Sequence, residues 1–124
     1  MAVPWYIARA TREILQAYRM TTFFVSRHSG AIEWARRKGL AVDRFVQHLD
    51  ASSIAQDDVV IGTLPANLAA EVCARGATYL HLSLDLPEGA RGRELSADDL
   101  DHFGARVERL FVEREVCADG CSLR

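Results

Sequence analysis

The feature of this sequence that most constrains its fold is a regular exchange of strand-like and helix-like segments. The strand-like segments, which are rich in β-branched, aromatic or alternating apolar residues, are 21–25 (TTFFV), 42–49, 59–61 (VVI) and 79–86. The helix-like segments between them are 31–38 and 66–75. Strands separated by helices of this length need crossover connections. The sequence therefore predicts an α/β fold, a Rossmann-like open, mostly parallel sheet flanked by helices in one domain.

Two further expectations concern the last third of the chain. Ser96, with Asp99 three positions on, predicts the start of a final helix. That helix should bury five apolar residues, namely Leu100, Phe103, Val107, Leu110 and Phe111. In the segment 79–86, Tyr79, His81 and Ser83 fall on one face of the strand. So polar a face favours a position at the sheet edge or in a subunit interface.

The overall composition limits the classes of partner. The 124 residues are 49% hydrophobic and 26% charged, as in a packed globular domain, and the formal net charge is -2. A protein that grips long nucleic acid usually carries a strong basic excess, so we expect no such partner. No apolar run approaches a membrane span, and the three cysteines (Cys73, Cys117 and Cys121) form no disulfide framework. We therefore expect a cytoplasmic protein without a membrane partner.

Composition also divides the chain. Residues 1–19 interleave aromatic and aliphatic residues with arginines, which is typical of a short amphipathic helix. We interpret them as an N-terminal extension, with a helix packed on the domain as the alternative. The predicted domain covers residues 20–116, and residues 117–124 form a C-terminal tail.

The strongest candidate site is the loop Ser26-Arg27-His28-Ser29-Gly30, between the end of a strand and the start of a helix. In parallel sheets, ligands bind outside the carboxyl ends of the strands. Hydroxyl groups and free backbone N–H groups at a helix N-terminus favour an anion. Arg27 adds a planar donor suited to phosphate, and His28 can exchange protons near neutral pH. The alternative is a serine-capped helix with a solvated Arg and His.

Two other loops are weaker candidates. Thr63, Leu64 and Asn67 follow the strand at 59–61 and should lie beside the first loop; the alternative is a threonine N-cap with proline in the first turn. Arg91 and Arg93 flank a glycine and could close over an anion, or could belong to a solvated loop.

The sequence lacks several motifs of established chemistry. It contains neither the dinucleotide-binding G-x-G-x-x-G nor the P-loop pattern, and neither a G-x-S-x-G nor an H-E-x-x-H motif. Cys117 and Cys121 have no nearby histidine, which makes a metal site improbable. We expect no metal and no cofactor.

Three long motifs resemble a family of known proteins. The runs TTFFVSRHSGAIEWARRKG, DVVIGTLPANLAAEVCARGATYLHLSLDLP and RGRELSADDL are similar to those of small stand-alone CRISPR-associated proteins of the CARF-like fold, which accompany type III CRISPR systems. The resemblance extends from Met20 to about Val112. It does not include the first nineteen residues or the cysteine-bearing tail.

This resemblance implies a function. Such a protein would bind cyclic oligoadenylate, with cyclic tetra-adenylate the expected ring, across the axis of a homodimer. It would also act as a ring nuclease that cleaves this second messenger and switches off type III CRISPR signalling. The alternative is a domain of the same fold that only senses or sequesters the messenger. A response-regulator-like domain is a poor match, because Ser26-Arg27-His28 stands where an acidic pair would be needed.

The residues are consistent with cleavage that needs no metal. A ribose 2′-hydroxyl aligned on the adjacent phosphorus can attack it and leave a 2′,3′-cyclic phosphate. Arg27 and the loop N–H groups would stabilise the phosphate charge, while His28 would protonate the leaving 5′-oxygen or relay a proton. Arg27 and His28 are thus the expected catalytic residues. The expected ligand-binding residues are Ser26, Ser29, Gly30, Thr63, Leu64, Asn67, Arg91 and Arg93.

Overall fold

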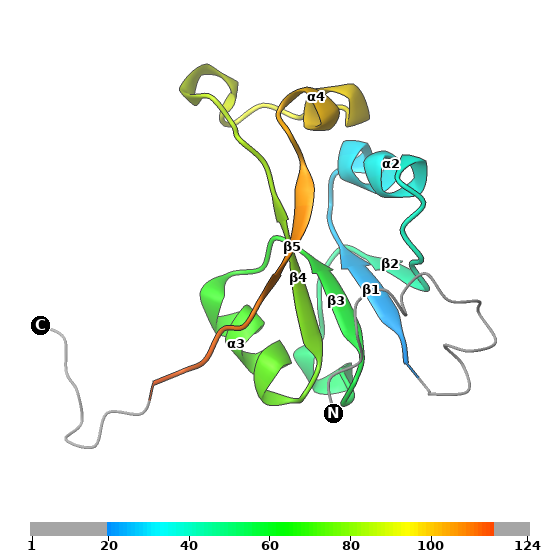
Figure 1. The fold of residues 1–124 in the computed structure, drawn as a ribbon, viewed down its shortest axis with the longest axis vertical. Coiled ribbons are helices and arrows are strands. Elements are labelled where there is room, and N and C mark those ends of the chain that lie inside the picture. The colour runs from blue at the N-terminus through cyan, green and yellow to red at the C-terminus, as the bar shows by residue number, and fades with distance from the viewer. Residues whose placement is uncertain (1–19, 116–124) are drawn as a thin grey trace, which may run out of the picture.

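The computed structural model describes residues 20–115, which form a five-stranded sheet with helices on both faces (Figure 1). The strands are β1 (Thr22–Val25), β2 (Arg44–Val46), β3 (Val59–Gly62), β4 (Thr78–Ser83) and β5 (Arg106–Leu110). The α-helices are α2 (Ser29–Arg37), α3 (Ala66–Ala74) and α4 (Ala97–His102), and two 3₁₀ turns are η2 (Ala51–Ser53) and η3 (Glu88–Ala90).

The strand order is β2-β1-β3-β4-β5. The first four strands are parallel and β5 is antiparallel to β4. This arrangement confirms the predicted α/β class and the mostly parallel open sheet. The crossovers through α2 and α3 are the connections that parallel neighbours require.

The central strands β1 and β3 are apolar on both sides, so each face of the sheet carries its own core. Phe23 and Val60 point to the α3 side, whereas the following residues, Phe24 and Ile61, point to the opposite side. On that opposite side the buried partners come from α2, α4 and β4: Ala31, Trp34, Ala35, Ala97, Leu100, Leu80 and Leu82. On the α3 side they are Ala69, Val72, Cys73, Ala77, Tyr79 and Ile54.

Helices α2 and α4 lie side by side on one face of the sheet (Figure 1). Trp34 donates its indole N–H to Asp101 Oδ1 over 3.1 Å, and Arg37 donates to Asp98 Oδ1 over 2.7 Å. Lys38 Nζ lies 2.9 Å from Asp101 Oδ1. The C-terminal half of α2 is therefore bound to α4 by polar contacts above their shared apolar core.

The predicted long final helix is wrong beyond His102. The capping box at its start is present, with Ser96 and Asp99 exchanging hydrogen bonds, but α4 ends after six residues. Gly104 follows with a φ of 69°, a left-handed conformation that stops the helix. The chain then forms β5, in which Val107 is half-buried and Leu110 is exposed, and Phe111 directly after the strand is exposed too. The apolar residues at 107, 110 and 111 have a helix-like spacing, but so short a pattern also occurs in a strand.

Two strand predictions also need correction. β4 is not at the sheet edge, because β5 pairs with it on the side away from β3. Its face carrying Tyr79, His81 and Ser83 is covered at Tyr79 by the α3 core, and Tyr79 is 2% exposed. The second strand is shorter than the predicted 42–49, and only Arg44–Val46 pair with β1.

The predictions for residues 1–19 and for the tail at 117–124, with Cys117 and Cys121, lie outside the described residues. Within residues 20–115, no helix is long and apolar enough to cross a lipid bilayer.

Candidate functional site

The candidate site is a pocket of about 390 Å³ at the carboxyl ends of the parallel strands. β1 has β2 on one side and β3 on the other, so the connections leaving β1 and β2 run in opposite directions across the sheet. In open α/β sheets such a switch point leaves a crevice that binds ligands. The topology therefore places the pocket where the sequence predicted it.

The pocket has an apolar floor and a polar rim. The floor is formed by Val25, Ala31, Leu82, Leu84, Leu95 and Leu100. The rim is formed by Ser26, Arg27, His28, Gln47, Thr63 and Arg93. Three of the rim side chains are basic, so the site combines a surface for an apolar ring with donors for an anion.

The loop after β1 presents its two candidate catalytic side chains to this pocket. Ser26 N–H donates to Val46 O over 3.0 Å, and Ser26 Oγ accepts from His28 N–H at 3.0 Å. His28 is the N-cap residue of α2 by its backbone, but its side chain makes no capping hydrogen bond. Arg27 and His28 are both exposed. The loop is thus a serine-stabilised turn rather than a serine-capped helix, and its Arg and His are solvent-exposed on the pocket rim.

Ser29 and Gly30 begin α2 and do not line the pocket. Gly30 is buried against the backbone of residues 95 and 96. A Cβ at this position would collide with the carbonyl oxygen of Leu95 and lie 3.0 Å from Ser96 Cα. Gly30 therefore permits close packing between the start of α2 and the segment before α4.

That close packing brings the third predicted loop to the site. Arg93 lines the pocket, and Glu94 Oε1 lies 3.7 Å from His28 Nδ1. Arg91 is exposed and lies outside the pocket lining. The arginine loop thus contributes one of its two predicted arginines to the pocket.

The loop after β3 contributes Thr63, whose side chain and flanking backbone are held by hydrogen bonds. Thr63 Oγ1 donates to Leu82 O over 3.1 Å. On either side of Thr63, Tyr79 Oη accepts from Leu64 N–H at 2.9 Å and lies 3.2 Å from Gly62 O. The helix that follows has Pro65 as its N-cap residue, so a threonine N-cap is not formed.

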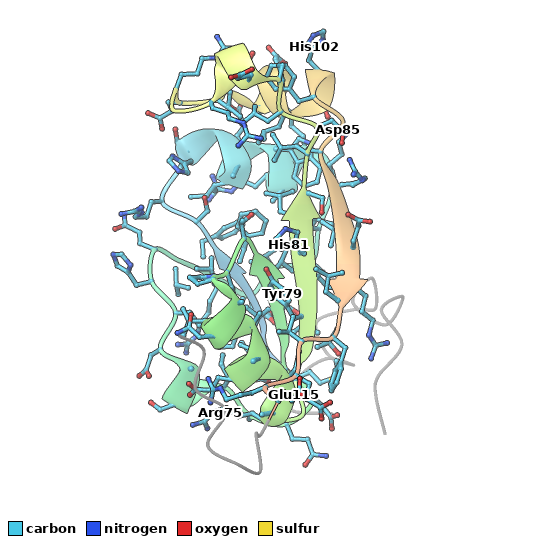
Figure 2. The ribbon with its side chains drawn as sticks, turned by 90° about the vertical axis from the view of Figure 1, so that its left-hand side faces the viewer. Arg75, Tyr79, His81, Asp85, His102 and Glu115 are labelled. Carbon is cyan, nitrogen blue, oxygen red and sulfur yellow. The ribbon has the colours of Figure 1, made fainter. Side chains whose placement is uncertain are left out.

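The same tyrosine reaches a histidine on its own strand. Tyr79 Oη lies 2.7 Å from His81 Nδ1, and both rings stand on the face of β4 that α3 partly covers (Figure 2). Burial raises the pKa of Tyr79, which keeps its hydroxyl protonated and able to donate. This polar cluster lies behind the pocket and fixes the turn that carries Thr63.

Leu64 and Asn67 do not line the pocket. The Leu64 side chain packs against the core on the α3 side of the sheet. Asn67 is exposed on the first turn of α3 and is absent from the lining. Of the eight predicted ligand-binding residues, Ser26, Thr63 and Arg93 are in the lining, while Ser29, Gly30, Leu64, Asn67 and Arg91 are not.

Sequence reasoning missed two polar residues of this region, Gln47 and Glu94. Gln47 directly follows β2 and lines the pocket, but the longer strand predicted for 42–49 absorbed it. The signal for Gln47 was its place after a strand at a switch point. Glu94 stands beside a predicted arginine, yet no local pattern connects it with His28, from which 66 positions separate it in sequence.

Arg27, His28 and Arg93 give the pocket basic groups of the kind that suit an anion, beside a surface that suits an apolar or aromatic group. Across residues 20–115, no group of three His, Cys, Asp or Glu side chains is arranged to hold a metal ion. Of the lining residues, His28 is of a type that can transfer a proton near neutral pH, and the two arginines carry positive charge that could stabilise an anion.

Comparison with known proteins identifies a family for this chain. No curated protein and no solved structure matches the chain. A family model described as "Putative CRISPR-associated protein (Cas_VVA1548)" matches residues 23–113. This match extends from β1 to the segment just after β5 and includes all twelve residues that line the pocket. The chain therefore belongs to the Cas_VVA1548 family of CRISPR-associated proteins.

Proposed function

We propose that this protein is a ring nuclease that binds and cleaves cyclic oligoadenylate, with cyclic tetra-adenylate as the expected ring. The observation that carries the proposal is the joining of Arg27, His28 and Arg93 over an apolar floor in one pocket. The arginines could donate charge-assisted hydrogen bonds to phosphate, and the adenine ring could pack on the apolar floor. Membership of a CRISPR-associated family supports the same substrate, because cyclic oligoadenylate is the messenger implied by the sequence resemblance.

The reaction would be an internal transesterification. The 2′-oxygen of one ribose forms a bond to the adjacent phosphorus, and the bond from phosphorus to the 5′-oxygen breaks. The 2′-hydroxyl proton passes to water, while His28 donates a proton to the departing 5′-oxygen and is reprotonated by water. The products are a 2′,3′-cyclic phosphate and a 5′-hydroxyl, so no metal or redox partner is needed.

The arginines would stabilise the charge that develops on the phosphate in the transition state. Arg27 and Arg93 come from different loops and line the same pocket, so they could contact the phosphate from different directions. Holding the 2′-oxygen in line with the breaking bond could supply much of the remaining rate enhancement.

The pocket of one chain suits one nucleotide better than a whole ring. Its volume of about 390 Å³ lies near the small end of pockets that hold drug-sized ligands. A symmetric ring of four nucleotides would therefore engage a second copy of the chain. We propose a homodimer that binds the ring across its two-fold axis.

The second candidate is a sensor or sequestering domain that binds the ring without cutting it. The observation that favours it is the exposure of His28, whose side chain is 63% accessible. Such a histidine could contact a phosphate without transferring a proton.

One experiment separates the two candidates. The full-length protein is incubated with cyclic tetra-adenylate, and separately with cyclic hexa-adenylate, in excess EDTA, and the products are resolved by chromatography. A ring nuclease of the proposed type yields linear products with 2′,3′-cyclic phosphate ends. Binding without cleavage supports the sensor. Activity that is lost in EDTA and restored by Mg²⁺ or Mn²⁺ contradicts the proposed mechanism, and absence of binding contradicts both candidates.

A further inference from the structure

Glu94 is the acidic partner of the pocket histidine. Its Oε1 lies 3.7 Å from His28 Nδ1, although the two residues come from different loops. The pocket lining also includes Arg27 and Arg93, and both of these side chains are basic. A carboxylate placed against one ring nitrogen of a pocket histidine is the arrangement that orients histidines in many sites.

Backbone packing brings the residue after Glu94 close to the start of α2. His28 directly precedes α2, and Gly30 in the first turn of that helix packs on the carbonyl of Leu95 and on Ser96 Cα. Because Gly30 has no Cβ, residues 94–96 can approach the start of α2 more closely than any side chain would allow.

The residues that follow, from Ser96 to the end of α4, are held in place by further contacts. Ser96 and Asp99 form a capping box, in which Asp99 N–H donates to Ser96 Oγ over 3.1 Å and Ser96 N–H donates to Asp99 Oδ2 over 3.0 Å. The helix that begins there is bound to α2 through the contacts of Asp98 and Asp101. Glu94 therefore reaches His28 from a position directly before a segment, residues 95–101, that is held against the same helix α2.

We propose that Glu94 is a positioning residue: when the two exposed side chains close the 3.7 Å between Glu94 Oε1 and His28 Nδ1 to hydrogen-bond distance, Glu94 holds a proton on Nδ1 and leaves Nε2 for the ligand. This inference rests on the proposed function for its role in cleavage, but the contact itself can be tested without substrate. In the neutral ring, a carboxylate that accepts from Nδ1–H favours the tautomer protonated at Nδ1.

In the reaction, this contact would determine which ring nitrogen of His28 gives up its proton. The protonated ring carries hydrogens on both nitrogens, with Nδ1–H toward Glu94 and Nε2–H available to the leaving 5′-oxygen. After Nε2 has given up its proton, the ring is already in the tautomer that Glu94 stabilises. A proton taken from water at Nε2 restores the starting state. Glu94 itself neither gains nor loses a proton.

The first test measures the tautomer of His28 in the ligand-free protein. Long-range ¹H–¹⁵N NMR distinguishes the Nδ1–H and Nε2–H tautomers of a neutral imidazole. We expect a larger Nδ1–H population in the wild type than in Glu94→Ala, where Nε2–H should dominate. Glu88→Ala is the matched control, because Glu88 is an exposed carboxylate of the same connection with no ion pair recorded among residues 20–115. An unchanged tautomer ratio in Glu94→Ala overturns the proposal.

The second test asks whether Glu94 acts through His28. With cyclic tetra-adenylate in single-turnover conditions, Glu94→Ala should slow cleavage by about three- to tenfold and leave Kd within about twofold. In the His28→Ala background, removal of Glu94 should have no further effect on the rate. If the double variant instead loses cleavage rate by the product of the two single losses, Glu94 does not act through His28 and the positioning role is overturned.

The two proposals fail in different ways. If wild-type protein binds no cyclic oligoadenylate, the proposed function is wrong, while the tautomer measurement still decides the contact of Glu94 with His28. If the protein cleaves the ring but the tautomer ratio does not depend on Glu94, the ring-nuclease function stands and the positioning role is wrong.

Discussion

Arg27 is the residue on which ligand binding is expected to depend most. It lies on the rim, is exposed, and makes no side-chain hydrogen bond or ion pair recorded within residues 20–115. Arg27→Ala should remove a charge-assisted phosphate contact worth about 1.5–3 kcal/mol. We therefore predict binding of cyclic tetra-adenylate weakened about ten- to a hundredfold, measured by calorimetry. The matched control is Arg91→Ala, because Arg91 lies outside the lining; equal losses in the two variants would contradict a specific contact.

His28 should separate binding from cleavage. Because its proposed role is proton transfer, His28→Ala should leave Kd within about threefold of the wild type and slow single-turnover cleavage by at least about tenfold. The side chain is exposed and makes no cap hydrogen bond, so the melting temperature should not change. Cleavage at the wild-type rate would favour the sensing domain and would move the search for a proton donor elsewhere in the pocket.

Ser29 and Gly30 of the first loop show that residue type alone does not distinguish a ligand-binding position from a packing position. Ser29 and Gly30 were expected to bind the anion, since small and hydroxyl-bearing residues are common at such sites. The structure places them in the first turn of α2 and uses Gly30 for contact with the Leu95 backbone. A missing side chain serves close packing to backbone as well as close approach to a ligand. Only the tertiary structure distinguishes these two uses.

At the scale of elements, the turn between β3 and α3 is stabilised by one buried hydroxyl. Tyr79 Oη accepts from Leu64 N–H and can donate to Gly62 O or His81 Nδ1. Tyr79→Phe leaves these groups without that partner and should lower the free energy of unfolding by about 1–3 kcal/mol. Urea denaturation of both proteins measures the difference.

The comparison with Thr63→Val makes the Tyr79 prediction specific. Thr63 is exposed and donates only to Leu82 O, so its replacement should cost less stability than that of Tyr79 while still altering the pocket rim. If Tyr79→Phe unfolds at the same urea concentration as the wild type, the hydroxyl does not stabilise the turn.

The start of α4 should be sensitive to acid. The backbone N–H of Ser96, followed by its hydroxyl, holds the pKa of Asp99 below its ordinary value of 3.8. A carboxyl group whose pKa is lower in the folded state contributes stability above its unfolded pKa and loses it as the pH falls through the folded pKa. Asp99→Asn should therefore show a smaller loss of stability than the wild type between about pH 4 and pH 2, measured by urea unfolding at each pH. Parallel pH curves for the two proteins would contradict this account.

The elements that sequence predicted well are those whose pattern is set by burial. β1 and β3 are apolar runs because both faces of these central strands are covered. α3 is rich in apolar residues because one side of it packs on the sheet. β5 escaped prediction because four of its five residues are exposed and three are charged. An edge strand of this kind has no apolar alternation, and charged residues protect such an edge from pairing with other chains.

At the scale of the whole molecule, the strand order explains where the pocket lies. Contacts between residues far apart in the sequence explain which side chains line it. Alternating strands and helices predicted carboxyl ends that meet at one edge, which is where the pocket lies. Loop order in the sequence did not reveal which arginine would reach it, because Arg93 is brought there by the Gly30–Leu95 contact. Pairing of this kind depends on the packing of α2 against α4, which no local pattern encodes.

The homodimer is the prediction that belongs to the whole molecule. If each chain supplies one pocket and the ring lies across a two-fold axis, one ring should bind per two chains. Isothermal titration with cyclic tetra-adenylate, using a variant in which cleavage is slowed such as His28→Ala, should give a stoichiometry of about 0.5 ring per chain. Sedimentation of the same sample should show a dimer, both with and without the ring.

Arg27→Ala provides the matched control for this stoichiometry. It should sediment as the same dimer, because Arg27 is exposed on the pocket rim and is not needed to bring the chains together in the proposed arrangement. Its titration should show weaker binding with an unchanged ratio of ring to chain. One ring bound per monomer, with no dimer at any protein concentration tested, would mean that a single pocket accommodates the ligand. In that case the two-fold arrangement would be wrong even if cleavage persists.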